Sequence, residues 1–372
     1  MATLNLKCYC CCISLLFFFL KQTCAQTSFT GKVINENNDS PIQSASIYFN
    51  NTTIGTYTDQ QGEFKFEDIN SLNTELVIFC YGYELIVFKP TAAQLAVKRF
   101  VFKLHPRKLL RTKTEDLSVE MKIICQNIFY KNFMGLTKEA TKSPIINADD
   151  MYFIPHTARK YFRVFADTAI VIINNLLGYK MSYNLVEFFY NEMADQAFFA
   201  GYCHYEKLDD DKKYQHSRNN CYKGSMQHFY RSLVANQLYQ QGFSTFLLMP
   251  VNAQSDNNND IVYNKENAIP ITAQQILLID SSNNFSIGIN GRLLVQYHKD
   301  PVTKSYLAQV LSYLSGDLDK GIEVYIDIKN SPIELTSIGV PVDDTNISFE
   351  GYWNYEGVAN TLPYDYQPQC TQ

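Results

Sequence analysis

Residues 29–66 read FTGKVINENNDSPIQSASIYFNNTTIGTYTDQQGEFKF. Short runs of alternating apolar residues are separated by polar clusters of Asn, Asp, Thr and Gly, which is the pattern of strands joined by tight turns. The same pattern continues through 75–81, 85–88 and 99–104. About seven strands at this spacing, with no helical pattern between them, predict a β-sandwich.

The segment Thr58-Asp59-Gln60-Gln61-Gly62 predicts a tight turn within this domain. Gly62 can adopt positive φ at low cost, and the Asp59 carboxylate can accept hydrogen bonds from nearby backbone N–H groups. Because turn chemistry accounts for both residues, we interpret the segment as structural rather than as a metal-binding or catalytic motif.

Several motifs of this region resemble a known family. In order they are Gly31-Lys32-Val33, Pro41-Ile42 before Ala45-Ser46-Ile47, Gly55, Thr58-Asp59, Gly62-x-Phe64 and Tyr81-Gly82-Tyr83-Glu84. They resemble the carboxypeptidase regulatory-like domain, a transthyretin-like sandwich common in exported proteins of the Bacteroidetes. The resemblance implies a cell-envelope location and an interaction or folding role. It does not imply proteolysis, because this module accompanies some metallopeptidases without being the peptidase.

The N-terminus has the pattern of a signal peptide. Lys7 precedes a short apolar run at 13–20, and the small residues of Thr23-Cys24-Ala25 suit a cleavage site. The apolar run is shorter than the roughly 20 residues needed to span a bilayer, so we expect no transmembrane helix. The sequence therefore predicts a signal peptide at 1–25 and an exported protein, located in the periplasm or associated with the outer membrane.

The mature chain divides into three predicted parts: the sandwich at 26–104, a polar linker at 105–116, and a β-rich α+β domain at 117–372. The overall fold class is therefore mainly β. Apolar spacing predicts two main helices in the second domain. One begins near Leu117 and ends before Gly135, and the other runs from the N-cap Ser225 to Gly242. Residues 252–267 are predicted to form a loop, and strands are predicted at 161–165, 169–173, 178–183, 186–190, 198–208, 286–294, 306–313 and 323–328.

The second domain resembles a recurring, uncharacterised companion of the sandwich module. The similar segments are Asn174–Tyr183, Tyr222–Leu233 with its His228-Phe229-x-Arg231, and Gly351-Tyr352-Trp353 followed by Leu362–Pro368. Because that family has no assigned activity, the resemblance implies architecture and location only.

Composition narrows the classes of partner. The net charge is −5 and no run of five basic residues occurs, which argues against a nucleic-acid-binding surface. The 26 Tyr and 25 Phe residues suit half-buried sheet surfaces, with a sugar- or ligand-stacking platform as the alternative. Outside the signal peptide the cysteines are few and scattered, so we expect mostly buried free thiols, and only Cys203 and Cys221 are considered as a pair.

No catalytic motif is evident. The six His residues form neither His-x-x-Glu nor His-Glu-x-x-His, so neither common zinc-peptidase motif is present, and we expect no metal and no cofactor. The acidic run Asp209-Asp210-Asp211 is interpreted as a solvated loop. The remaining suspects are His204 with Glu206, which share one face of a predicted strand, and His228 with Arg231 on one helix face.

Two functions remain open from the sequence. The leading hypothesis is a non-catalytic cell-envelope protein, not an enzyme, that acts through contacts with a partner protein or a glycan. The alternative is an unrecognised hydrolase whose site in the second domain would use His204, Glu206, His228 and Arg231.

Overall fold

The computed structural model describes residues 27–69, 74–91, 94, 99–108, 117–209, 211–251, 262–298, 322–343 and 346–369. The predicted signal peptide, residues 109–116 of the predicted linker, the strand predicted at 306–313 and Cys370 lie outside the described residues. So do residues 252–261 of the loop predicted at 252–267.

The first domain is a seven-stranded β-sandwich, as the sequence predicted. One sheet has the order β4-β1-β7 and the other β3-β2-β5-β6. Strand β1 pairs antiparallel with β4 and parallel with β7. The two sheets enclose buried apolar residues that include Phe29, Ile47 and Leu76. The strands are β1 (Thr27–Asn35), β2 (Ser46–Phe49), β3 (Gly55–Tyr57), β4 (Glu63–Ile69), β5 (Leu76–Phe79), β6 (Ile86–Phe88) and β7 (Arg99–Leu104).

The turn before β4 confirms the structural interpretation of the Asp59–Gly62 motif. The Asp59 Oδ1 atom accepts hydrogen bonds from the backbone N–H groups of Gln61 and Glu63, at 2.9 and 2.8 Å. Gly62 has φ of 72°, and a Cβ there would lie 2.5 Å from the carbonyl oxygen of Val33. Both residues are therefore fully used in shaping the turn.

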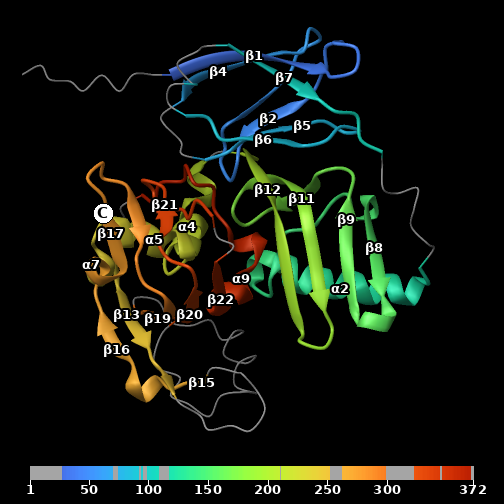
Figure 1. The fold of residues 1–372 in the computed structure, drawn as a ribbon. Coiled ribbons are helices and arrows are strands. Elements are labelled where there is room, and N and C mark those ends of the chain that lie inside the picture. Colours follow the sequence, from blue (N-terminus) through green and yellow to red (C-terminus); the bar gives the residue numbers. More distant parts are fainter. Residues whose placement is uncertain are drawn as a thin grey trace, which may run out of the picture.

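Two five-stranded sheets form the framework of the second domain (Figure 1). The first has the order β10-β11-β9-β8, with β12 also paired to β11, and the second has the order β16-β13-β19-β20-β22. The strands of the first sheet are β8 (Met151–His156), β9 (Tyr161–Ala166), β10 (Ile170–Asn174), β11 (Tyr179–Asn191) and β12 (Gln196–Lys207). Those of the second are β13 (Phe243–Leu248), β16 (Ile269–Ile271), β19 (Gly291–Tyr297), β20 (Ile322–Ile328) and β22 (Ile347–Gly351).

Two smaller sheets complete the strand content of the described residues. Strand β14 pairs with β15, and β18 lies between β17 and β21. Their bounds are β14 (Pro250–Val251), β15 (Val262–Tyr263), β17 (Leu277–Ile279), β18 (Phe285–Ile287) and β21 (Ile333–Leu335).

The helices differ from the prediction of two main ones, because three substantial helices occur among the described residues. They are α2 (Val119–Met134), α4 (Asp211–Tyr222) and α5 (Met226–Val234). Ser225 caps α5 by accepting a hydrogen bond from the His228 N–H, as predicted. The shorter helices are α3 (Lys138–Thr141), α6 (Leu238–Gln241), α7 (Ala273–Ile276), α9 (Tyr352–Glu356), and the 3-10 turns η2 (Ala148–Asp150), η3 (Thr157–Arg159), η4 (Lys265–Asn267) and η5 (Val358–Asn360).

One helix prediction and the end of one loop prediction were wrong for identifiable reasons. The helix expected over 225–242 is broken into α5 and α6, because Asn236 adopts a left-handed φ of 53° between them. The acidic loop expected at 209–211 ends where α4 begins, at Asp211. Acidic residues are favourable at a helix N-terminus, so the same residues suit a helix start.

Two strand predictions also require correction. The strands predicted at 178–183 and 186–190 are one strand, β11, whose register shifts between Leu185 and Glu187. The strand predicted at 286–294 is two strands, β18 and β19, which belong to different sheets. The chain leaves one sheet and enters the other between Ile287 and Gly291.

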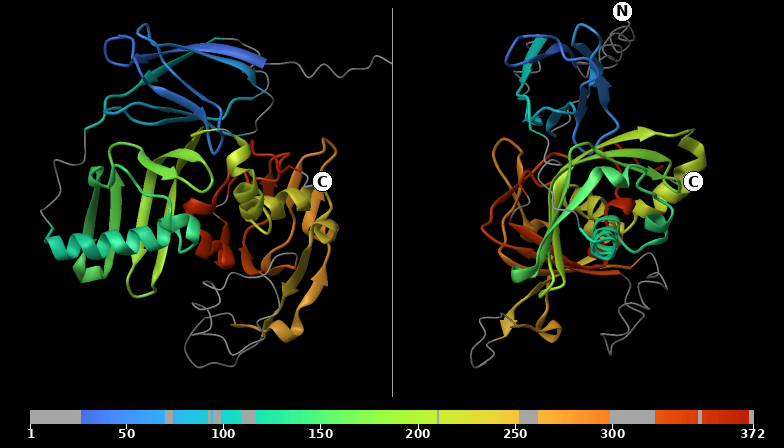
Figure 2. Two further views of the ribbon diagram at one scale, coloured as in Figure 1. Left: turned by 180° about the vertical axis from the view of Figure 1, so that it is seen from behind. Right: turned by 90° about the vertical axis from the view of Figure 1, so that its right-hand side faces the viewer.

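Helix α2 packs on one face of the β8–β12 sheet (Figure 2). The ring of Phe129 lies 4.8 Å from the ring of Phe133 and 4.8 Å from that of Phe188, and Phe153 also contacts it. A second core surrounds α5, where Phe229 and Trp353 pack together against the other large sheet. No helix among the described residues is long and apolar enough to cross a membrane.

Replacing Phe129 by Ala should lower the free energy of unfolding by about 3–5 kcal/mol, because the fully buried ring leaves a cavity. Chemical denaturation monitored by circular dichroism measures this loss. The matched control is Val119→Ala on the same helix, where 76% of the side chain is exposed and stability should stay unchanged. Equal stability of both variants would contradict the packing described.

Candidate functional site

The turn between β2 and β3 docks the sandwich onto the second domain. The Asn51 N–H donates to the Cys203 carbonyl at 2.7 Å, and the Tyr205 N–H donates to the Thr52 carbonyl at 3.0 Å. Together they form a short parallel bridge between Thr52 and His204. Within the described sheet β12 pairs only with β11, so the turn covers the free edge of β12. We call residues 48–57 and 202–206, together with 364–365, the joint.

Side chains reinforce the joint around Tyr48. The Tyr48 ring stacks on the imidazole of His204, with centroids 5.1 Å apart and an interplanar angle of 18°. Its hydroxyl accepts a hydrogen bond from Nδ2 of Asn184 at 2.7 Å and donates to the Tyr202 carbonyl at 3.3 Å. At the Nε2 edge of the imidazole, a Cβ at Gly55 would lie 2.3 Å from Nε2. The position therefore admits only glycine without displacing the imidazole.

The C-terminal segment also contacts the turn between β2 and β3. The Tyr364 N–H donates to the Asn51 carbonyl at 2.6 Å, and Oδ1 of Asp365 accepts from the Thr53 N–H at 2.9 Å. The Thr53 hydroxyl also donates to the other oxygen of Asp365. Arg231 on α5 holds this segment in place, because its guanidinium donates to the carbonyls of Tyr366 and Tyr364 at 2.9 and 2.8 Å.

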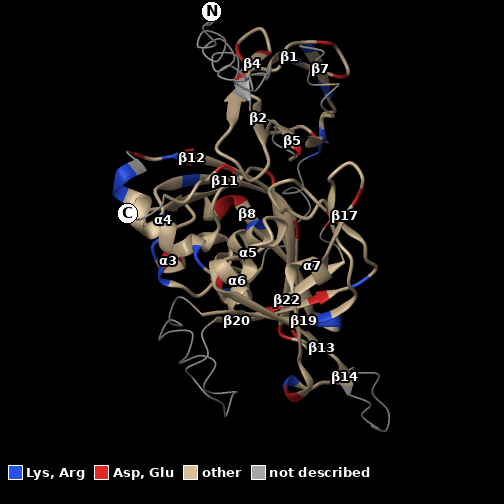
Figure 3. Cartoon of the chain, turned by 90° about the vertical axis from the view of Figure 1, so that its left-hand side faces the viewer, with Lys and Arg blue, Asp and Glu red and all other residues tan. Residues whose placement is uncertain are grey.

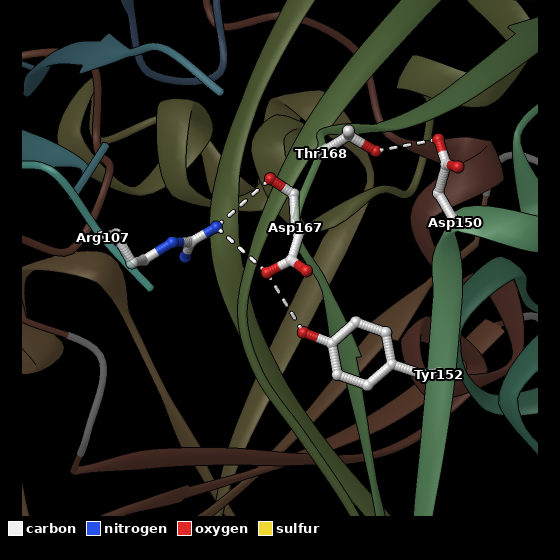
Figure 4. A network of polar contacts seen from close by, with 5 residues as sticks. All are labelled: Arg107, Asp150, Tyr152, Asp167 and Thr168. Carbon is white, nitrogen blue, oxygen red and sulfur yellow. Dashed lines mark hydrogen bonds and ion pairs between the residues drawn. The ribbon is translucent and has the colours of Figure 1, made fainter. Parts of the chain in front are cut away.

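Arg107, just after β7, makes a second attachment between the domains (Figure 4). Its guanidinium donates to the backbone carbonyl of Asp167 at 3.2 Å and reaches the Asp167 carboxylate at 3.5 Å. The same carboxylate accepts from the Tyr152 hydroxyl at 3.2 Å. Beside it, Thr168 donates to Asp150 at 3.1 Å. The first residues of the predicted linker therefore contact the second domain directly.

Two of the four suspected catalytic residues, His204 and Glu206, lie in the joint. Both face the sandwich, as expected for residues two apart on a strand. His204 is only 4% exposed. Glu206 pairs with Lys180 at 2.9 Å and contacts the Tyr57 hydroxyl at 3.5 Å. Their contacts serve the docking of the sandwich.

The other two suspects, His228 and Arg231, lie on α5 and have separate partners. Nδ1 of His228 accepts from the Gly224 N–H at 3.1 Å, and its Nε2 lies 3.2 Å from the side-chain oxygen of Gln241. The imidazole is buried against the ring of Phe243. Arg231 donates to backbone carbonyls, as described above. The four residues therefore lie in two sets of contacts, one in the joint and one around α5.

No metal site is formed among the described residues, because no group of three or more His, Cys, Asp or Glu side chains could hold an ion there. Cys203 and Cys221 are both buried free thiols rather than a disulfide. Burial raises the pKa of each thiol, which keeps both protonated and unreactive as nucleophiles.

A partly buried carboxyl group, Glu356, is a feature that the sequence interpretation missed. Burial, with a smaller contribution from the negative charge of Glu139, raises its pKa to about 8. Nearby, Asn360 donates to the Glu139 carboxylate at 3.4 Å and contacts Sγ of Cys221 at 3.6 Å. Nothing in the local sequence distinguishes Glu356 from an exposed glutamate, since its burial comes from elements far apart in the chain.

The first domain is thus a β-sandwich module whose described contacts with the larger α+β domain include the joint and the attachment at Arg107. Residues 29–113 match the family model of the CarboxypepD_reg-like domain, so the chain carries a carboxypeptidase regulatory-like domain. None of the curated proteins matches the sequence. Among solved structures, the chain is similar to a 9R-lipoxygenase from Cyanothece PCC8801, at 10% identity and a TM-score of 0.17, over 58% of this chain and 48% of that one. That TM-score is too low to support an argument about fold or activity.

Gly55→Ala should weaken the joint, because the new methyl group would collide with the buried imidazole of His204. We expect a loss of about 1–3 kcal/mol in the stability of docking, seen as faster hydrogen exchange at the N–H groups of Asn51 and Tyr205. The control is Thr56→Ala, whose side chain points to the opposite face of β3. Unchanged exchange in Gly55→Ala would contradict the close approach.

Glu356→Gln should stabilise the protein at neutral and alkaline pH. Between pH 4.5 and 8 the folded protein keeps a proton on Glu356 that the unfolded chain releases, so wild-type stability falls as pH rises. Gln cannot ionise, so the variant should gain about 2 kcal/mol at pH 8 and nothing at pH 4. Urea denaturation across this range measures the difference. The exposed Glu334→Gln is the control, and a gain independent of pH would contradict the assignment.

Proposed function

We propose that the chain is a non-catalytic exported protein of the cell envelope, in the periplasm or associated with the outer membrane, that acts through contacts with a partner protein or a glycan. Export is supported by the signal-like N-terminus of the sequence and by the resemblance of the sandwich to modules of exported proteins. The binding role is supported chiefly by one surface of the second domain.

This surface is the face of the β8–β12 sheet that points away from α2. A row of directly paired residues crosses four strands on it: Ile154 opposite Arg163, Arg163 opposite Phe189, and Phe189 opposite Phe198. Phe198 is 58% exposed and Ile154 is 41% exposed. We call these four residues the aromatic row, after the two rings of Phe189 and Phe198 at its centre and one end.

The surroundings of the aromatic row suit recognition. The Tyr161 ring lies 5.1 Å from that of Phe189, and the His156 ring lies 4.9 Å from that of Tyr161. Arg163 pairs with Glu187 at 3.1 Å, which places polar groups beside the rings. Exposed rings with polar neighbours are typical of protein interfaces and can also stack on the apolar face of a sugar. In the ribbon coloured by charge, segments with Lys or Arg and segments with Asp or Glu are interspersed along the chain in the view of Figure 3.

The alternative function, a hydrolase in the second domain, finds less support. His204 and Glu206 are occupied in the joint, while His228 and Arg231 have structural partners around α5. Such contacts favour a role in holding the molecule together over a role in a reaction.

The proposal predicts that removing rings from the aromatic row weakens binding. The experiment isolates a protein or polysaccharide ligand from cell-envelope extracts and measures its affinity for the full chain by calorimetry. The double variant Phe189→Ala, Phe198→Ala should bind at least about tenfold more weakly, as expected for central aromatic contacts.

The control is Tyr239→Ala, which removes an aromatic side chain that is 85% exposed elsewhere on the molecule. Its affinity should equal that of the wild type. Finding no protein or polysaccharide ligand, or equal binding by the double variant, would refute the proposed role. Turnover of the isolated ligand by the wild type would favour the hydrolase alternative instead.

A further inference from the structure

We propose that the joint between the sandwich and the second domain is pH-sensitive: it is closed when His204 is neutral, and protonation of His204 opens it. This inference concerns the contact between the domains and is independent of the ligand proposed above.

The imidazole of His204 is buried and closely packed. The residue is 4% exposed, with the Tyr48 ring stacked on one side and the backbone of Gly55 against its Nε2 edge. Its ring also hydrogen-bonds to the backbone of Thr53. Nδ1 is buried and has no hydrogen-bond partner among the described residues. These contacts assign the neutral ring a proton on Nε2 and a lone pair on Nδ1.

Protonation would therefore place an N–H donor and a full charge at a buried position without an acceptor. Leaving a buried donor unsatisfied costs about 1–3 kcal/mol, and more when the group is charged. Asn184 donates through its amide nitrogen to Tyr48, and its side-chain oxygen is buried without a hydrogen-bond partner, so no hydrogen bond joins that oxygen to Nδ1 of His204. An open joint would relieve the cost by exposing the imidazolium to water.

The charged groups around His204 do not compensate for its burial. Burial lowers the pKa of His204, and Lys180 lowers it further, whereas Glu206, Asp365 and the Thr53 backbone oppose this shift only partly. Glu206 is already paired with Lys180, and Asp365 with Thr53. The titratable groups that face His204 are Tyr48 on β2, Tyr57 on β3, Lys180 on β11, Glu206 on β12 and Asp365 in the C-terminal segment.

The direction of the pH effect follows from the pKa shift. In the closed joint His204 has a lowered pKa, and in an open joint it would return to its ordinary value of about 6.5. The open form thus binds more protons below pH 6.5, so acidification favours opening and the closed form is most stable above that pH. Each pH unit between the two pKa values can change the opening equilibrium by up to about tenfold.

Opening would swing the sandwich rather than release it. The backbone bonds of Asn51 and Tyr205 lie on either side of His204 and would be lost together. The attachment at Arg107 includes a hydrogen bond to the backbone carbonyl of Asp167, which does not titrate. That attachment would therefore persist at acidic pH and keep the end of the sandwich near β7 in contact with the second domain.

The test is hydrogen exchange of the full chain between pH 8 and pH 5, corrected for the intrinsic pH dependence of exchange and followed at the N–H groups of Asn51 and Tyr205. We expect wild-type protection to fall at the acid end, by up to about tenfold for each pH unit below 6.5. His216→Gln, on the exposed face of α4, should behave like the wild type. His204→Gln should have protection that does not change with pH. Constant wild-type protection, or an unaltered acid response in His204→Gln, would overturn the proposal.

His204→Gln could also open the joint at every pH, because it lacks the ring that stacks on Tyr48. In that case the wild-type chain decides the question. With 13C-labelled histidine, the His204 resonance is identified by its absence in the variant and titrated by NMR. A pKa below 6.5 that accompanies the loss of protection supports the proposal, and a value at or above 6.5 overturns it.

Discussion

The parallel bridge between Thr52 and His204 is the contact on which the arrangement of the two domains depends. A strand edge exposes backbone donors and acceptors that need partners. At the end of β12, those partners come from the turn after β2. Tyr48, Gly55 and the C-terminal segment then surround the bridge, so side-chain contacts add to the backbone pairing that joins the two domains.

Because of this contact, His204 has a structural role in docking the sandwich rather than the catalytic role that its spacing from Glu206 suggested. His204 and Glu206 share a strand face, which is compatible with catalysis, but that face is covered by the sandwich. Arg231 does not contact the bridge, but it holds the C-terminal segment by donating to the Tyr364 carbonyl. The next residue of that segment, Asp365, accepts the hydrogen bond from Thr53. His204 therefore lies in the joint itself, whereas Arg231 supports the joint indirectly through the C-terminal segment.

Local chemistry made much of the fold predictable from the sequence. The turn at Asp59–Gly62, the cap at Ser225 and the end of α2 at Gly135 depend on neighbouring residues, so their patterns were sufficient. The break at Asn236 and the start of α4 were missed because Asn and Asp suit both helix ends and loops. The joint was not predictable, since the polar turn at 50–53 has no feature that specifies a partner in β12.

The seal of the joint has a consequence for the order of folding. Thr53 and Asp365 are 312 positions apart, so their hydrogen bonds form only after nearly all of the chain is available. The sandwich has its own core and its own sheets, and can fold as soon as it emerges. The backbone bridge to β12 needs the chain only as far as Tyr205. The contacts of residues 364–366 are added later, so the complete joint forms late among the long-range contacts of the fold.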